Sequence, residues 1–188
     1  MDAEAEIRLT WIGRVDIDPD LLGRVRCQVE RIFDRPTNLR VAHGPPEEAL
    51  DRKRGQYSST KILRWIVTTL ASGSNKVLGI TDVDLFIQVL TYVFGEAQVR
   101  GAAAVVSLAR LRVTYNQRPA PPPLMEARLL KECLHELGHT FGLVHCSDSA
   151  CLMSRSNSVL DVDLKGAQFC RDCRQRLWGL MDEEREQS

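Results

Sequence analysis

The chain has 188 residues, with 25 basic (Lys and Arg) and 25 acidic residues and a formal net charge of zero. Hydrophobic residues make up 44% and charged residues 27%, which excludes a largely disordered chain. The neutral balance argues against a nucleic-acid-binding protein, because such proteins carry a basic field. No apolar run is long enough for a transmembrane helix. The acidic start, residues 1–6, is unlike a signal peptide and favours a cytoplasmic protein.

The N-terminal part of the sequence predicts a strand, a helix and a second strand. Residues 7–11 alternate apolar and polar side chains, the pattern of a half-buried strand. Asp18 and Pro19 are typical of the cap and first position of a helix. One side of this helix carries the apolar residues Leu22, Val25, Val29, Ile32 and Phe33. Residues 38–42 then predict a short strand, and the polar, proline-containing residues 45–56 a surface loop.

The middle of the sequence continues this alternation. A helix is expected over residues 59–70, capped by Ser59 or Thr60 and broken by residues 72–75. Three strands are expected next, over residues 77–86, 91–99 and 102–113. Residues 115–123 are rich in proline and should lie outside any element. Strands that alternate with helices predict a mixed α/β sheet.

The strongest pattern in the sequence is His-Glu-Leu-Gly-His-Thr-Phe-Gly-Leu-Val-His at residues 135–145. On a helix, His135 and His139 lie one turn apart, on the face opposite an apolar stripe. Gly142 permits the chain to turn there and to bring His145 back as a third ligand. Three histidines leave one tetrahedral position open, which is typical of a catalytic zinc ion.

Glu136 stands beside these histidines and is the candidate general base. It is expected to hold a zinc-activated water and to accept its proton, which predicts a hydrolytic site. A single helical histidine usually has only a packing role, but five fixed positions would match by chance with a probability of order 10⁻⁴ in such a chain. The alternative is a metal-binding or interaction protein with little or no enzymatic turnover. The intact Glu136 argues against this alternative.

Four cysteines follow the histidine motif with the spacing of a second metal site. Cys146 and Cys151 have four residues between them, Cys170 and Cys173 have two, and eighteen residues separate the pairs. Four thiolates complete a tetrahedral shell, so this zinc ion is expected to be structural. The alternatives are buried thiols, a redox pair at Cys170 and Cys173, or a zinc-ribbon-like interaction module.

Residues 133–173 resemble the archaemetzincins, a branch of the metzincin zinc metallopeptidases. The resemblance rests on the histidine motif at residues 135–145 and on the cysteines and methionine that follow it. It implies a metzincin-like α/β (α+β) fold, with a mixed twisted sheet, helices, a central active-site helix and a smaller irregular C-terminal lobe with a structural zinc. Residues 1–188 would then form one metallopeptidase domain, with an N-terminal lobe at 1–142 and a C-terminal lobe at 143–188. Two zinc ions, one catalytic and one structural, would be its cofactors.

The resemblance also assigns roles around the cleft. Met153 would belong to the Met-turn, an apolar floor below the catalytic zinc; the alternative is a core methionine that fills a gap. The strand over residues 91–99 would form the upper rim, where a peptide docks as an added strand. The substrate would be a peptide or small protein, no nucleic-acid or membrane partner is expected, and a monomer is favoured. The candidate substrate-binding positions are Thr91, Phe94, Gly95 and Ala97.

Overall fold

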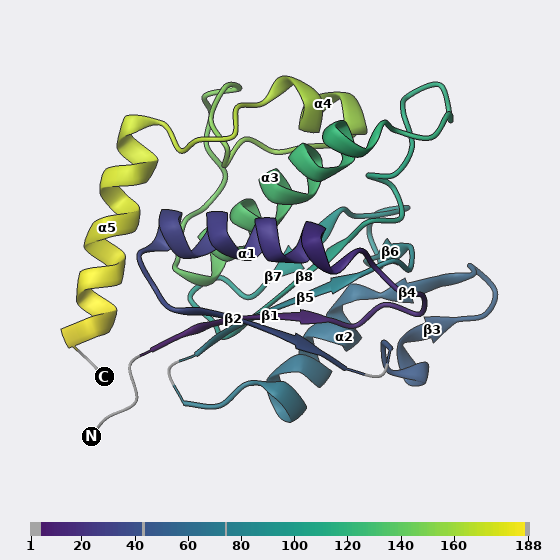
Figure 1. Cartoon of the computed structure of the whole chain (residues 1–188), viewed down its shortest axis with the longest axis horizontal. Coiled ribbons are helices and arrows are strands. Elements are labelled where there is room, and N and C mark those ends of the chain that lie inside the picture. Colours follow the sequence, from purple (N-terminus) through teal and green to yellow (C-terminus); the bar gives the residue numbers. More distant parts are fainter. Residues whose placement is uncertain (1–4, 43, 74, 187–188) are drawn as a thin grey trace.

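The computed structural model describes residues 5–42, 44–73 and 75–186, and its centre is a five-stranded sheet in the order β2-β1-β5-β8-β7 (Figure 1). Four of the strands run parallel, and β7 pairs antiparallel with β8 at one edge. The sheet is therefore mixed, as the sequence predicted. Its strands are β1 (Ile7–Trp11), β2 (Thr37–Val41), β5 (Lys76–Thr81), β7 (Gly95–Ala97) and β8 (Ala103–Ser107).

Helices cover both faces of this sheet. The helices α1 (Pro19–Phe33) and α3 (Pro122–Thr140) lie on one face, and α2 (Ser59–Trp65) lies on the other and continues as a π-helical turn, Ile66–Leu70 (Figure 1). The C-terminal segment adds α4 (Val159–Leu164) and α5 (Arg171–Glu186). The result is a three-layer arrangement that places α3 between the sheet and the C-terminal segment.

Helix starts follow local backbone chemistry, with two differences from the prediction. Asp18 caps α1 as expected, since its carboxylate accepts a hydrogen bond from the Asp20 N–H at 2.9 Å. The cap of α2 is Ser58, whose hydroxyl accepts from the Lys61 N–H, so the prediction of Ser59 or Thr60 was wrong by one or two residues. α3 already begins at Pro122, inside the expected loop, because a proline in the first turn has no N–H to leave unpaired.

The predicted loop over residues 45–56 is partly ordered structure. It contains a 3-10 turn, Glu47–Ala49, whose Ala49 is buried. A second, three-stranded sheet follows, with the strands β3 (Leu50–Asp51), β4 (Gln56–Ser58) and β6 (Leu85–Phe86). The predicted strand over 77–86 is thus two strands of different sheets. Residues 1–4 of the acidic start and Ser74 of the predicted helix break lie outside the described residues.

Two further strands are shorter than predicted. Of residues 91–99, Gly95–Ala97 pair with β8, and the residues before them form an irregular rim. The apolar run over residues 102–113 leaves the sheet at residue 107, and the Leu111 N–H then bonds to the Leu108 carbonyl in a turn. Both leucine side chains are buried. A short apolar run indicates burial but does not by itself distinguish a strand from a turn, which is why the predicted strand was too long.

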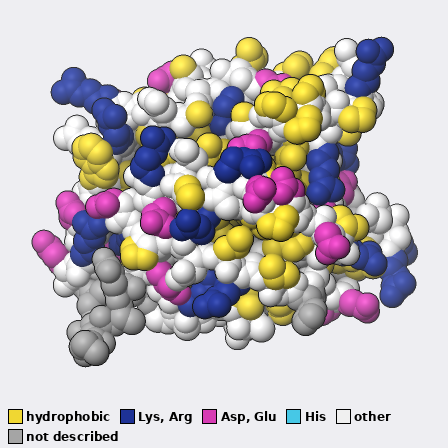
Figure 2. Space-filling view, viewed as in Figure 1, with side chains coloured by type: hydrophobic (Ala, Val, Ile, Leu, Met, Phe, Trp, Pro, Cys, Tyr) yellow, Lys and Arg dark blue, Asp and Glu magenta, His cyan; other side chains and the backbone are white. Residues whose placement is uncertain are grey.

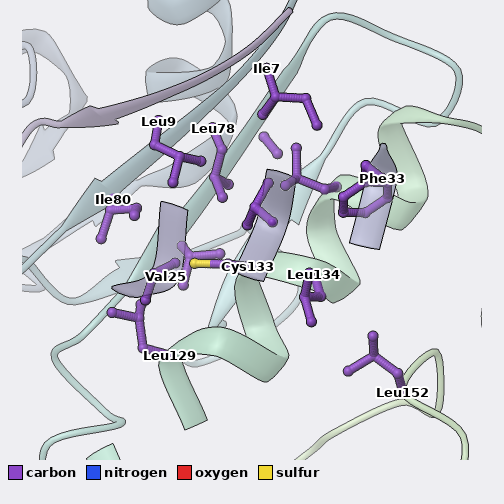
Figure 3. Close-up of a cluster of buried hydrophobic side chains, with 14 of the residues drawn as sticks. Ile7, Leu9, Val25, Phe33, Leu78, Ile80, Leu129, Cys133, Leu134 and Leu152 are labelled. Carbon is purple, nitrogen blue, oxygen red and sulfur yellow. The ribbon is translucent and has the colours of Figure 1, made fainter. Parts of the chain in front are cut away.

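The main core fixes the orientation of α3. Leu9, Leu78 and Ile80 of the sheet face Val25 and Phe33 of α1 in a single cluster (Figure 3). The side of α3 that enters this cluster carries Leu129, Cys133, Leu134 and Leu137. Complete burial stabilises a large aliphatic side chain by about 1.5–3 kcal/mol, so α3 has one strongly preferred rotation. The histidines of α3 consequently face away from the sheet.

The surface agrees with the neutral charge balance. Basic and acidic side chains are interspersed on the face in Figure 2. Within the described residues, no helix has the length and apolar character that crossing a bilayer requires.

Candidate metal centres and active-site cleft

The side chains of His135 and His139 are held by backbone carbonyls. His135 Nδ1 donates to the Leu152 carbonyl at 2.9 Å, and His139 Nδ1 donates to the Leu143 carbonyl at 2.7 Å. A carbonyl can only accept, so each Nδ1 carries the proton and each Nε2 presents a lone pair. The two Nε2 atoms are 3.2 Å apart.

His145 completes the histidine cluster from the loop after α3. Gly142 has a φ of 107°, and the chain reverses there. The ring centroid of His145 is then 5.3 Å from that of His135 and 4.9 Å from that of His139. Burial and the neighbouring His139 lower the pKa of His145 to about 4, and burial also lowers the pKa values of His135 and His139. All three imidazoles are therefore neutral near pH 7.

The histidine cluster fits a zinc ion. One nitrogen of each ring lies within 4.8 Å of the others, and tetrahedral nitrogens bonded at about 2.0–2.1 Å to zinc lie roughly 3.3 Å apart. Lone pairs of neutral imidazoles that converge without a proton between them repel each other, and a cation removes this repulsion. The predicted ligand set is thus brought together, with the rings of His135 and His139 held in the tautomer that zinc binding requires.

Glu136 lies in a tight space beside this cluster. Its side chain lines the cleft and is only 6% exposed. A Cβ on Gly95 would lie 2.7 Å from Glu136 Cγ and Oε1, so β7 can pass here only because residue 95 is glycine. The sequence pointed to Gly95 as a rim position, but not to this role. Burial first, and the Glu132 carboxylate second, raise the pKa of Glu136 well above its usual value.

The four predicted cysteines also form one cluster. The sulfur atoms of Cys146, Cys151, Cys170 and Cys173 all lie within 4.8 Å of one another, with 3.9 Å between Cys146 and Cys170. A disulfide has a sulfur–sulfur distance of about 2.05 Å, and all four thiols are free. Four sulfurs bonded at about 2.3 Å to tetrahedral zinc would lie roughly 3.8 Å apart. The cluster therefore fits a closed structural zinc site.

Backbone donors surround these sulfurs. The Cys151 sulfur accepts from the N–H groups of Met153 and Cys170, and the Cys170 sulfur accepts from the Cys173 N–H. The last bond is the main cause that lowers the pKa of Cys170, whereas burial raises the pKa values of Cys151 and Cys173. Cys170 directly precedes α5 and Cys173 lies in its first turn, where the helix dipole favours thiolates. These donors are typical of a site that holds a metal ion on thiolates.

Met153 lies directly under the histidine motif. It is fully buried, and a Cβ on Gly138 would come within 2.8 Å of its sulfur. Its carbonyl accepts from the Cys146 N–H at 2.9 Å, which ties it to the loop after His145. Met153 thus packs against α3 between the two metal-ligand clusters.

A cleft of about 500 Å³ opens beside His135, His145 and Glu136. Of the predicted rim positions, Thr91, Phe94 and Gly95 line it and Ala97 does not. The opposite wall is residues 155–157, next to α4. The Tyr92 hydroxyl donates to the Asn157 carbonyl at 2.9 Å and joins rim and wall.

Sequence reasoning missed a set of buried charges between α3 and α4. Arg128 binds Asp163 through two hydrogen bonds of 2.6 and 2.7 Å, and Glu132 pairs with Lys165 at 2.8 Å. Arg128, Glu132 and Lys165 are each at most 3% exposed. Arg128 and Glu132 lie four residues apart on α3, one turn before His135, and this spacing was the signal available in the sequence.

Comparisons with known proteins decide the family. A family model described as Peptidase family M54 matches residues 4–178. The chain belongs to this family. An archaemetzincin from Methanopyrus kandleri is 44% identical over 88% of this chain and 90% of its own. One from Methanocaldococcus jannaschii is 43% identical over 70% of this chain and 72% of its own. The crystal structure of the Methanopyrus kandleri archaemetzincin has a TM-score of 0.81 at 35% identity and covers 94% of this chain and 96% of its own.

M54 membership confirms the resemblance found in the sequence. The chain is a zinc-dependent metallopeptidase that acts on peptides. Family membership therefore favours the peptidase over the alternative of a metal-binding protein with little turnover. The metzincin-like mixed α/β fold is likewise confirmed, and the two ligand clusters fit the predicted catalytic and structural zinc ions.

Proposed function

We propose that this M54 peptidase binds its catalytic zinc ion through His135, His139 and His145 and uses Glu136 as general base. The observation that carries the proposal is the convergence of two unprotonated Nε2 atoms, 3.2 Å apart, at a cleft that Glu136 also lines. When bound, zinc polarises the peptide carbonyl and makes water more acidic.

Glu136 moves the proton. Burial raises the pKa of this carboxyl group, and a more basic carboxylate is a better proton acceptor. Glu136 takes the proton from the attacking water and then delivers it to the amine that leaves. Gly95 leaves the space that this side chain needs, and the buried surroundings keep other water away from it.

The rim strand binds the substrate backbone. β7 has β8 on one side only, so its other edge offers N–H and C=O groups to an extended peptide. Thr91, Phe94 and Gly95 contact the peptide along this rim, and Ala97 extends the edge beyond the cleft. Such pairing aligns the scissile bond with the histidines.

The second zinc ion is structural and is held by Cys146, Cys151, Cys170 and Cys173. It ties the loop after His145 to the start of α5. Met153 belongs to the Met-turn and forms the apolar floor below the catalytic zinc, and its packing against Gly138 supports this role.

The remaining assignments follow from the core and the surface. Residues 1–188 form one domain with lobes 1–142 and 143–188, because Leu152, Met153 and Leu177 of the second lobe belong to the same core cluster as the sheet. The protein acts as a cytoplasmic monomer and does not bind nucleic acid. A cysteine cluster that suits zinc rather than disulfides supports a reducing compartment, and the interspersed charges in Figure 2 support the absence of nucleic-acid binding.

The proposal is tested by Glu136→Gln. The amide keeps the shape but cannot take the proton, so peptide cleavage should fall about 10²–10⁴-fold while zinc content and folding stay unchanged. Glu48→Gln, at an exposed glutamate, is the matched control and should cleave like the wild type. Cleavage that survives in Glu136→Gln would refute the assignment of the base.

A further inference from the structure

We propose that Glu132 determines which substrate side chain enters the cleft, and that it favours a long side chain with an apolar stem and a hydrogen-bond donor at its end. The inference rests on the proposed function, because the occupant is a side chain next to the scissile bond. It assigns a role to a carboxylate that the hydrolytic step does not use.

Glu132 lies one turn before Glu136 on α3 and lines the same cleft. Its side chain is 4% exposed and that of Lys165 is 2% exposed, and Oε1 lies 2.8 Å from Lys165 Nζ. Of this buried pair, Glu132 lines the cleft and Lys165 does not.

Glu132 has spare acceptor capacity. A carboxylate offers about four lone-pair sites. Within the described residues Glu132 forms an ion pair with Lys165 at 2.8 Å, and its Oε1 accepts no hydrogen bond. A ligand that reaches Glu132 with a donor can therefore form a charge-assisted hydrogen bond in a place that excludes most water. A purely apolar group would leave the remaining lone pairs of Glu132 without a donor, and a substrate carboxylate would meet a like charge.

The apolar walls of the cleft favour the methylene groups of a long substrate side chain. Val89, Leu90, Val93 and Phe94 line the rim side of the cleft, and their carbon surfaces suit the methylene groups of a long side chain. Lysine and glutamine combine such a stem with a terminal donor. We expect lysine to bind better than glutamine, because its donor carries a charge opposite to that of Glu132.

Arg155 could instead favour an acidic substrate side chain, which is the outcome that competes with selection by Glu132. It lines the same cleft but is exposed to water at its wall. A preference for an acidic side chain would show that Arg155, and not Glu132, decides the selection.

The test uses peptides that differ only in one residue next to the scissile bond: lysine, glutamine, norleucine or glutamate, placed on either side of that bond. With wild-type, zinc-loaded protein, kcat/KM for the lysine and glutamine peptides should exceed that for norleucine by at least about tenfold at one of the two positions. The glutamate peptide should be the poorest. Equal cleavage of all four, or a preference for norleucine or glutamate, would overturn the proposal.

Removing only one member of a buried pair leaves the other charge unpaired, so the decisive variant replaces both. Glu132→Met with Lys165→Met should fold, keep zinc and prefer norleucine over lysine. The matched control is Arg128→Met with Asp163→Leu, a neighbouring pair on α3 and α4 that does not line the cleft. It should keep the preference for lysine. An unchanged preference in the Glu132 and Lys165 double variant would refute the role of Glu132.

Peptide binding separates this inference from the proposed function. Affinities for the same four peptides, measured with zinc-loaded Glu136→Gln, should follow the same order without any turnover. If the wild type cleaved none of the peptides but this binding order held, the proposed hydrolytic role would fail and the selection by Glu132 would stand. Loss of the binding order would reject the selection whether or not cleavage occurs.

Discussion

The histidine cluster and the cysteine cluster meet at adjacent residues, His145 and Cys146, yet they differ in almost every physical respect. The histidine cluster has three ligands and borders a cleft of about 500 Å³. The cysteine cluster has four ligands and joins an irregular segment to α5. Ligand number separates the roles: three ligands leave a position for chemistry, whereas four close the site and make it part of the fold.

The two clusters are also held in different ways. Backbone carbonyls accept hydrogen bonds from His135 and His139, which leaves their Nε2 lone pairs free. Backbone N–H groups donate to the sulfurs of Cys151 and Cys170, which favours thiolates. The first arrangement rests on a helix that the main core already orients. The second ties together a segment with little regular structure, so the two sites should respond differently to mutation.

The largest expected effect is on activity, in His139→Ala. The loss of one of three ligands removes the catalytic zinc, and a Lewis acid that contributes several kcal/mol corresponds to at least about a thousandfold in rate. The melting temperature should change little, because α3 keeps its core contacts. Retained peptidase activity, or a collapse of the fold as severe as that of a cysteine variant, would remove the distinction between the sites.

The next effect is on stability, in Cys170→Ser. Loss of a structural metal site belongs to the small class of changes that cost about 4 kcal/mol or more of the free energy of unfolding. Cys27→Ser is the matched control, since Cys27 is exposed and lies outside the cluster, and it should change this free energy by less than about 0.5 kcal/mol. Denaturant unfolding in the presence of zinc measures both, and similar values for the two variants would contradict the structural role.

The smallest expected effect is in Gly95→Ala, which keeps all seven metal ligands. The added methyl would lie 2.7 Å from Glu136 and 2.7 Å from the Val105 carbonyl oxygen of β8, so the base or the rim strand must shift, and a misplacement of about 1 Å can lower the rate up to about a hundredfold. Gly23→Ala adds the same methyl in open space on α1 and should leave kcat unchanged. If Gly95→Ala has wild-type kcat, the close fit of Glu136 against β7 has no catalytic importance.

The ligands of both clusters could be predicted from the sequence, because each set is defined by short spacings along the chain. His135 and His139 are set one turn apart by helix geometry alone, and the cysteine spacing needs only short loops. The start of α1 was predicted for the same reason, because Asp18 and Pro19 act on neighbouring backbone groups. These features do not require knowledge of the tertiary fold.

The features that were missed depend on distant partners. The rim strand is shorter than predicted because only Gly95–Ala97 meet β8 in register. The pairing of Glu132 with Lys165 joins residues 33 positions apart, and α4 decides which side chains meet there. The apolar run over 102–113 was predicted as one strand, but only Ala103–Ser107 pair in the sheet, and backbone hydrogen bonds turn the chain after Ser107.

The most direct test of the central claim is the zinc content of purified, zinc-reconstituted protein. The wild type should hold two zinc ions per chain, His135→Ala with His139→Ala should hold one and remain folded, and Cys170→Ser with Cys173→Ser should lose zinc together with its stability. A wild type that binds at most one zinc ion, or a histidine double variant that still holds two, would contradict the account of one catalytic and one structural site.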